Sequence, residues 1–193
     1  MKRLLIAHIL SGPAATFINA LRQQYDVRTA CAIDAHVSLA GPCNIETSVQ
    51  RLEAVLARIA AAVQPFQLTI TGVATFLPVT NTSYLQAEPR ERLADLHDVI
   101  VARLDWQEAF PYVPHVTITE YLAPRDTANV VRQLRLLGVL EHTWLSTIAL
   151  LEKAADGRWR KLKHFAVGKK NSEAAARTEQ EPCTNDARLR DGS

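Results

Sequence analysis

Two copies of one four-residue pattern constrain the fold of this chain more than any other feature of its sequence. Residues 36–39 read His-Val-Ser-Leu, and residues 115–118, which lie 79 positions later, read His-Val-Thr-Ile. Alternate residues of a β-strand point to the same face, so we expect each histidine to lie beside the hydroxyl residue of its own copy. The aliphatic residues would then face a buried layer. Each copy would present one imidazole and one hydroxyl on the same surface.

The chain around the two motifs repeats at the same spacing. Periodicity and turn residues predict strands over residues 4–10, 30–39, 66–76, 83–87, 112–121, 144–153 and 159–167. They predict helices around Phe17, Leu21 and Tyr25, over residues 47–63, and after Pro89 and Pro124. Each half therefore reads strand, helix, motif strand, helix, strand, and the second half adds one closing strand. This duplication predicts an α+β fold of two pseudo-symmetric lobes, each a small antiparallel sheet backed by helices, with both motifs in a central groove.

The repeat also sets the expected domain limits. We predict one bilobal domain over residues 1–168, with repeat halves of about 3–78 and 82–168. Residues 169–193 contain five basic and five acidic residues and almost no large apolar ones. Such a segment cannot bury a core, so we predict a disordered C-terminal tail.

Composition narrows the cellular setting and the partners. The net charge is only +2, which does not indicate a general nucleic-acid binder. No apolar run approaches membrane-spanning length, and the short run after Met1 that faintly resembles a secretion signal is interrupted at His8. The three cysteines are odd in number and form no Cys-x-x-Cys pair, which favours a reducing, cytoplasmic compartment and argues against a zinc knuckle. We expect a monomer that does not bind a membrane.

The two motifs and their flanks resemble the 2H phosphoesterase superfamily, which includes 2'-5' RNA ligase-like proteins and 2',3'-cyclic nucleotide phosphodiesterases. The resemblance rests on the paired His-x-Ser/Thr-x motifs, on residues 72–78 (Gly-Val-Ala-Thr-Phe-Leu-Pro) and on residues 110–114 (Phe-Pro-Tyr-Val-Pro), and it covers about residues 3–168. One position departs from it: many RNA ligase-like members carry a basic residue where this chain has Glu120. That departure puts the binding of long RNA in doubt more than it does catalysis.

The resemblance implies RNA processing chemistry in which a 2',3'-cyclic phosphate on a nucleotide or an RNA 3' end is opened to a 2'-phosphate. Opening requires a base on water and an acid on the ribose oxygen, and histidine serves both roles near neutral pH. We assign His115 as base and His36 as acid, although pseudo-symmetry leaves the reverse open. The hydroxyls of Ser38 and Thr117 would bind the phosphate, and no metal or other cofactor is required.

Other interpretations of the same residues stay open. The histidines could be buried core residues, or metal ligands, although no third ligand has a suitable spacing. The chain could join RNA ends through a 2'-5' bond, or bind RNA or nucleotides without chemistry. Aromatic residues near the motifs could stack on a base or pack in the core: Phe76, Tyr84, Phe110 and Tyr112. Tyr121, six residues after His115, could reach the phosphate of a substrate or merely lie at the edge of the sheet. Lys153, Arg158, Arg160 and Lys161 could guide RNA or be a solvated face, and His97 and His142 are expected to be solvated.

Overall fold

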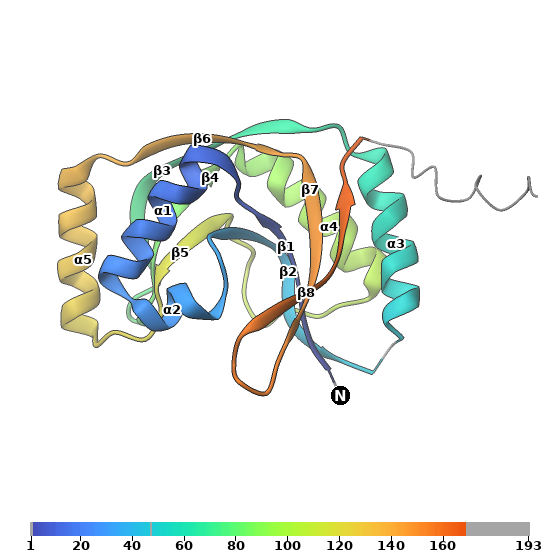
Figure 1. The fold of residues 1–193 in the computed structure, drawn as a ribbon, viewed down its shortest axis with the longest axis horizontal. Coiled ribbons are helices and arrows are strands. Elements are labelled where there is room, and N and C mark those ends of the chain that lie inside the picture. Colours follow the sequence, from blue (N-terminus) through green and yellow to red (C-terminus); the bar gives the residue numbers. More distant parts are fainter. Residues whose placement is uncertain (1, 47, 169–193) are drawn as a thin grey trace, which may run out of the picture.

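Two antiparallel sheets of four strands each form the framework of the computed structural model, which describes residues 2–46 and 48–168 (Figure 1). The first sheet has the order β2-β1-β7-β8, with bounds β1 Lys2–Ile9, β2 His36–Ile45, β7 Thr147–Lys153 and β8 Trp159–Ala166. The second has the order β5-β4-β3-β6, with bounds β3 Phe66–Thr75, β4 Ser83–Glu88, β5 His115–Thr119 and β6 Leu140–Leu145. The two motif strands, β2 and β5, are the equivalent edge strands of the two sheets. The predicted α+β fold with two lobes is confirmed.

Each sheet takes strands from both halves of the sequence. In the first sheet, β1 of the first half pairs with β7 of the second half. In the second sheet, β3 of the first half pairs with β4 and β6 of the second half. The single strand predicted over residues 144–153 is therefore wrong. The chain leaves the second sheet after Leu145, passes Ser146 and enters the first sheet at Thr147, because β6 pairs with β3 and β7 pairs with β1.

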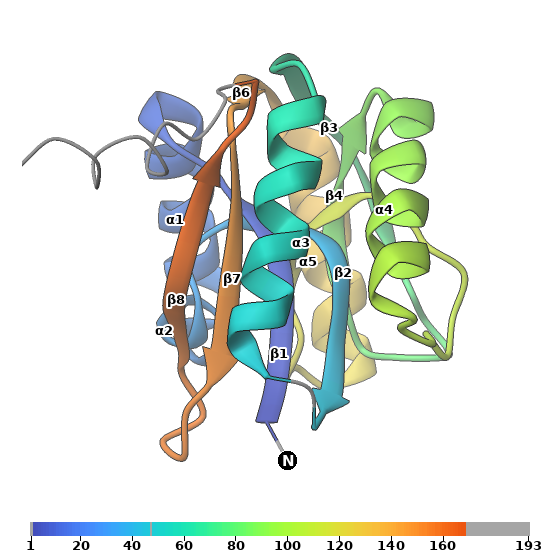
Figure 2. The ribbon, with the colours of Figure 1, turned by 90° about the vertical axis from the view of Figure 1, so that its right-hand side faces the viewer.

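Five helices complete the described part of the chain: α1 Gly12–Tyr25, α2 Val27–Ala32, α3 Val49–Ala62, α4 Arg90–Leu104 and α5 Pro124–Leu137. Helices α1 and α5 pack on the second sheet, and α3 and α4 pack on the first, so the helices lie on the two outer sides of the molecule (Figures 1 and 2). None of these helices is both long and apolar enough to cross a membrane. The predicted helix start at Thr47 falls outside the described residues, and the side chain of Ser48 caps α3 by accepting from the Arg51 amide.

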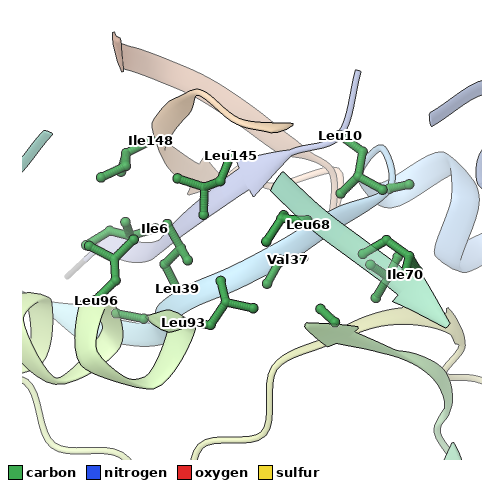
Figure 3. Close-up of a cluster of buried hydrophobic side chains, with 14 of the residues drawn as sticks. Ile6, Leu10, Val37, Leu39, Leu68, Ile70, Leu93, Leu96, Leu145 and Ile148 are labelled. Atoms are coloured by element: carbon green, nitrogen blue, oxygen red, sulfur yellow. The ribbon is translucent and has the colours of Figure 1, made fainter. Parts of the chain in front are cut away.

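One apolar core joins the two lobes. Figure 3 shows Val37 and Leu39 of β2 near Leu68 and Ile70 of β3, with α4 closing one side. The aliphatic residues of both motifs, Val37, Leu39, Val116 and Ile118, are all 0% exposed. The alternation predicted from the motifs is therefore confirmed, and the core fixes which face of each strand carries the histidine and the hydroxyl residue.

The segment before the first motif differs from the prediction. Residues 30–32, the start of the strand predicted over residues 30–39, belong instead to the short helix α2. Asp26 caps this helix by accepting hydrogen bonds from the amide and the hydroxyl of Thr29. The strand also continues past Gly41, where it was predicted to end. Gly41 adopts a left-handed backbone (φ 85°), and β1 and β2 shift register there as in a β-bulge.

The second motif strand is shorter than predicted. β5 covers only His115–Thr119 of the predicted residues 112–121. Pro111 and Pro114 lack the N–H that a regular ladder requires, so the chain reaches the motif as an extended loop. The predicted tail, residues 169–193, lies outside the described residues.

Candidate active site

The two motif strands border one large cavity between the lobes. The cavity has a volume of about 1060 Å³, and the side chains of His36, Ser38, His115 and Thr117 all line it. Each histidine is the first residue of its strand, and each hydroxyl residue follows two positions later on the same face. The structure therefore brings together the four residues that the sequence placed in the groove.

The two imidazoles are oriented in the same way by their own backbones. His36 Nδ1 lies 2.8 Å from the carbonyl oxygen of Asp34, and His115 Nδ1 lies 2.6 Å from that of Val113, in both cases two residues earlier in the chain. A carbonyl oxygen can only accept, so Nδ1 carries the proton and donates it in both rings. Nε2 of the neutral ring is then left with a free lone pair, so it can act as a general base. Once Nε2 has taken up a proton, the same ring can act as a general acid.

The surroundings hold both histidines neutral at pH 7. Burial lowers the pKa of His36 to about 4, against a smaller opposing effect from the carbonyl of Asp34. Positive charge on Arg22 and on His115 lowers this pKa further. Burial also lowers the pKa of His115, again against the hydrogen bond to Val113. The two rings line the same cavity, and protonation of His115 opposes protonation of His36.

Aromatic rings pack against His115. Phe76 lines the cavity and meets the His115 ring edge to face, with centroids 5.1 Å apart and an interplanar angle of 87°. Tyr84 stacks on Phe76 at 4.3 Å and lies 5.1 Å from the His115 ring. Tyr84 is only 7% exposed and is not among the residues that line the cavity. Phe76 is therefore placed where it could meet a ligand, and Tyr84 is placed to hold Phe76 and His115.

Tyr121 lies at the rim of the cavity and is 44% exposed. The guanidinium of Arg28, from α2, lies 4.2 Å from the centre of its ring. Asp26 fixes this corner, since its Oδ2 accepts from the backbone amides of Glu120 at 2.9 Å and of Tyr121 at 3.1 Å. The start of α2 is thereby tied to the residues that follow the second motif.

The loop over residues 105–114 crosses from the second lobe to the first motif. Tyr112 donates its hydroxyl to the backbone oxygen of Ser38 at 2.9 Å, and its ring stacks on His97 at 4.0 Å. His97 donates from Nδ1 to the Leu39 carbonyl at 2.9 Å, and Glu108 accepts from the Gly41 amide at 2.6 Å. The expectation that His97 is solvated is wrong, because it is 7% exposed and bonded to β2. The loop thus holds the backbone of the first motif strand in place.

The turn between β7 and β8 supplies another wall of the cavity. Lys153 and Trp159 line it, with the ammonium of Lys153 lying 5.8 Å from the centre of the Trp159 ring. The neighbouring basic residues Arg158, Arg160 and Lys161 are not among the lining residues. Only one member of the predicted basic cluster therefore faces the groove.

Sequence reasoning missed several charged residues of the cavity wall, and Arg22 is the one among them that is fully buried. Arg22 of α1 lines the cavity and is 0% exposed, and its guanidinium donates to Asn19 Oδ1 at 3.2 Å and to the Thr29 carbonyl at 2.9 Å. Arg22 lies one helical turn after Ile18, which is buried in the core, so its spacing could have marked it as an inward-facing charge.

Within residues 2–46 and 48–168, no three His, Cys, Asp or Glu side chains gather as metal ligands would. The cysteines described there, Cys31 and Cys43, are both free thiols. The cavity wall thus contains the two motif imidazoles and their two hydroxyls, together with the Cys43 thiol, further hydroxyl residues and a few charged side chains.

Two imidazole–hydroxyl pairs on equivalent strands of a two-lobed α+β fold define a class of phosphoesterase, and comparison with known proteins agrees. The model of the 2'-5' RNA ligase superfamily matches residues 10–157. The chain belongs to this superfamily and, with it, to the 2H phosphoesterase family.

Relatives of known sequence are similar over most of their length. The protein named Putative phosphoesterase OB1230 of Oceanobacillus iheyensis is 32% identical over 154 residues, which cover 78% of this chain and 89% of that protein. Putative phosphoesterase GK0864 of Geobacillus kaustophilus is 32% identical over 158 residues, which cover 81% of this chain and 91% of that protein.

Solved structures share the fold at lower identity. TT0787 of Thermus thermophilus superposes with a TM-score of 0.64 at 19% identity, covering 86% of this chain and 98% of that one. LigT of E. coli, crystallised with 3'-AMP, superposes with a TM-score of 0.57 at 19% identity, covering 87% of this chain and 99% of that one. These similarities establish the common two-lobed architecture.

Proposed function

We propose that this protein is a metal-independent phosphodiesterase that opens 2',3'-cyclic phosphates to 2'-phosphates. The observation that carries this proposal is the matched orientation of the two imidazoles. Both donate from Nδ1 to a carbonyl two residues earlier, and both line one cavity with a hydroxyl residue beside them. Acid–base catalysis on a phosphodiester requires two such groups, one on either side of the phosphorus.

In the proposed reaction, Nε2 of His115 takes a proton from water while the water oxygen attacks phosphorus. The anionic phosphate beside His36 raises the pKa of this ring in the substrate complex, so Nε2 of His36 takes up a proton when the substrate binds. The bond from phosphorus to the ribose 3' oxygen then breaks, and Nε2 of His36 donates that proton to the departing oxygen. Ser38 and Thr117 donate hydrogen bonds to the non-bridging oxygens, on which negative charge increases as the phosphorane forms. The product is a nucleoside or RNA end with a 2'-phosphate and a free 3'-hydroxyl.

The size and lining of the cavity support a nucleotide or an RNA 3' end as substrate. Its volume of about 1060 Å³ lies just above the range of roughly 300–1,000 Å³ for small-molecule pockets, which leaves room for a nucleotide. Phe76 and Tyr121 are placed where a base could stack. LigT of E. coli has been crystallised with 3'-AMP and with phosphate, which favours the same class of ligand for this fold. We further propose that the protein acts as a cytoplasmic monomer, consistent with its free thiols.

A second candidate is the joining of RNA ends through a 2'-5' phosphodiester. It is favoured by the superfamily whose model this chain matches. The chemistry differs only in the nucleophile, because a ribose 5'-hydroxyl would take the place of water beside His115.

The experiment is a turnover assay of the purified full chain with EDTA present. The substrates are 2',3'-cyclic mononucleotides, a short RNA ending in a 2',3'-cyclic phosphate, and the same RNA mixed with a 5'-hydroxyl RNA. Phosphorus NMR distinguishes a 2'-phosphate product from a 3'-phosphate, and a gel detects ligation. The double variant His36→Ala/His115→Ala, purified identically, controls for contaminating nucleases. Binding of a cyclic nucleotide without turnover would instead indicate a binding module.

A further inference from the structure

Arg22 is a buried cation that has no carboxylate in direct contact. Among the described residues, no Asp or Glu oxygen lies within ion-pair distance of its guanidinium, and its partners are the amide oxygen of Asn19 and the carbonyl of Thr29. Its Nε is buried and has no hydrogen-bond partner. A buried charge is costly unless it is paired. Burial still lowers the pKa of Arg22 overall, so the carboxylates of Asp34, Asp26 and Glu120 compensate its charge only in part.

The hydrogen bonds of Arg22 lead to both motif strands. Asn19 Oδ1, which accepts from Arg22, also accepts from the amide of Ala35 at 2.8 Å, directly before His36. On the other side, Thr29 is bonded to Asp26, whose carboxylate holds the amides that follow the second motif. Arg22 therefore lies at the centre of a network that runs from the start of β2 to the end of β5.

The protonation states of the groups in the cavity also favour a role for Arg22 in binding an anion. Burial lowers the pKa of Arg22 to about 10, so its guanidinium stays protonated at pH 7. His36 and His115 are neutral at that pH, and the hydroxyls of Ser38 and Thr117 carry no charge. A phosphodiester brings a negative charge to this cavity. Arg3 and Lys153 also line it, but Arg3 is exposed and Lys153 half-buried, whereas Arg22 is buried, so the charge of Arg22 is the least screened by water.

We propose that Arg22 supplies the positive charge that holds the phosphate anion between the two motifs, while its hydrogen bonds position the residue before His36. The inference deepens the proposed function and rests on it for the identity of the anion. Arg22 acts as a positioning and charge-supplying residue, and proton transfer belongs to the two histidines. Both halves of the chain therefore contribute to the first motif. Arg22 comes from α1 of the first half, and Tyr112, which donates to the Ser38 carbonyl, comes from the second half.

The test compares Arg22→Gln and Arg22→Lys with a matched control, Arg28→Gln. Arg28 belongs to the same corner of the molecule but is exposed and lies over Tyr121. The probe is inorganic phosphate, titrated into the full chain at pH 7 and followed through the imidazole resonances of His36 and His115. NMR titration of the same variants gives the pKa of His36. Thermal unfolding measures any purely structural effect.

We expect Arg22→Gln to weaken phosphate binding by about 10- to 100-fold, the range for loss of a hydrogen bond to a charged group. The pKa of His36 should rise, because a neighbouring positive charge has been removed. Arg22→Lys should keep most of both effects even if its melting temperature falls, and Arg28→Gln should change neither. A folded Arg22→Gln variant with unchanged phosphate affinity and unchanged His36 pKa overturns the proposal, as does an equal loss in Arg28→Gln.

A second measurement does not depend on whether the Arg22→Gln variant folds. In the unmodified protein, the Arg22 Nε–Hε resonance, assigned by its absence from Arg22→Lys, should shift with phosphate and saturate together with the histidine signals. Absence of that shift, or absence of saturable phosphate binding, overturns the proposal. Neither readout requires turnover. Failure to open cyclic phosphates would therefore count against the proposed function alone, and failure of these shifts would count against Arg22 alone.

Discussion

The two halves of the site have nearly the same local sequence but different surroundings. His36 and His115 donate from Nδ1 to the carbonyl two residues earlier, and both begin an edge strand. His36, however, is influenced by the charge of Arg22, whereas His115 packs against the rings of Phe76 and Tyr84. The repeated motif determines how each ring is held, and unrelated parts of the chain determine how each ring titrates.

This difference teaches that duplication need not give two equivalent catalysts. An imidazole beside a fixed cation and one among aromatic rings are not equivalent, because burial lowers the pKa of both rings and the positive charge of Arg22 lowers the pKa of His36 further. The first motif is further held by Tyr112 through the Ser38 carbonyl, and no equivalent bond to the Thr117 carbonyl is seen within the described residues. Four changes test how far the two halves differ.

The largest effect should come from removing either imidazole. His36→Ala and His115→Ala should each lower turnover of a 2',3'-cyclic nucleotide by about 10²–10⁴-fold, the usual cost of losing a positioned acid or base. Steady-state kinetics measures this loss. His142→Ala removes an exposed histidine of β6 and should leave the rate unchanged. Parent rates in both single variants would show that the two-histidine mechanism is wrong.

Removing a motif hydroxyl should cost less than removing an imidazole. Ser38→Ala and Thr117→Ala should each reduce kcat by about 10- to 100-fold, since one donor to a charged oxygen is lost. Exchange of the two residue types, Ser38→Thr with Thr117→Ser, keeps both hydroxyls and should restore most activity. If the exchanged variant is as slow as the alanine variants, side-chain packing rather than hydrogen bonding accounts for the loss.

The low pKa of His36 should make stability depend on pH. The folded chain holds His36 neutral down to about pH 4, whereas the unfolded side chain takes up a proton near pH 6.5. The unfolded state therefore binds more protons between these values, and the free energy of unfolding should fall as the pH is lowered from about 6.5 toward about 4. Urea unfolding at several pH values measures this slope. His36→Gln should flatten it relative to His142→Gln, and an unchanged slope would contradict the lowered pKa.

The smallest effect should come from removing the Tyr112–Ser38 hydrogen bond, which has no counterpart at the second motif within the described residues. Tyr112→Phe removes the hydroxyl that donates to the Ser38 carbonyl. A hydrogen bond of this kind contributes about 0.5–1.5 kcal/mol, which corresponds to a decrease of about 1–6 °C in melting temperature for a chain of this size. Differential scanning calorimetry measures the change, and Tyr25→Phe provides the control. A larger loss of activity than of stability would show that the bond also positions Ser38 for catalysis.

Local sequence was enough to predict the parts of the site that depend on strand alternation. Val37, Leu39, Val116 and Ile118 are buried as the motif predicted, and the hydroxyl residues consequently face the cavity. Gly138 likewise ends α5 in a left-handed conformation, as glycine at that position indicates.

The features that were missed depend on contacts between distant residues. The split at Ser146 arises because β6 and β7 find partners in different sheets, and no local signal specifies that choice. Asp26 and Tyr112 make bonds to residues 94 and 74 positions away, which hydrophobic periodicity cannot reveal. Arg22 differs, because its hydrogen-bond partners lie only three and seven residues away and its spacing from Ile18 could have marked it as inward-facing. The sequence could not show that it lines the same cavity as His36.

The most direct test of the two-histidine account uses a substrate whose leaving group needs no acid. Hydrolysis of 3'-deoxyadenosine 2'-(4-nitrophenyl phosphate), which has no neighbouring hydroxyl to attack phosphorus, is measured for the parent, His36→Ala and His115→Ala. Because nitrophenolate leaves without protonation, His36→Ala should recover most of its lost rate relative to the parent, and His115→Ala should stay slow. Recovery of His115→Ala alone would reverse the two roles. Equal recovery of both variants, or of neither, would contradict the claim that the two motifs supply one acid and one base.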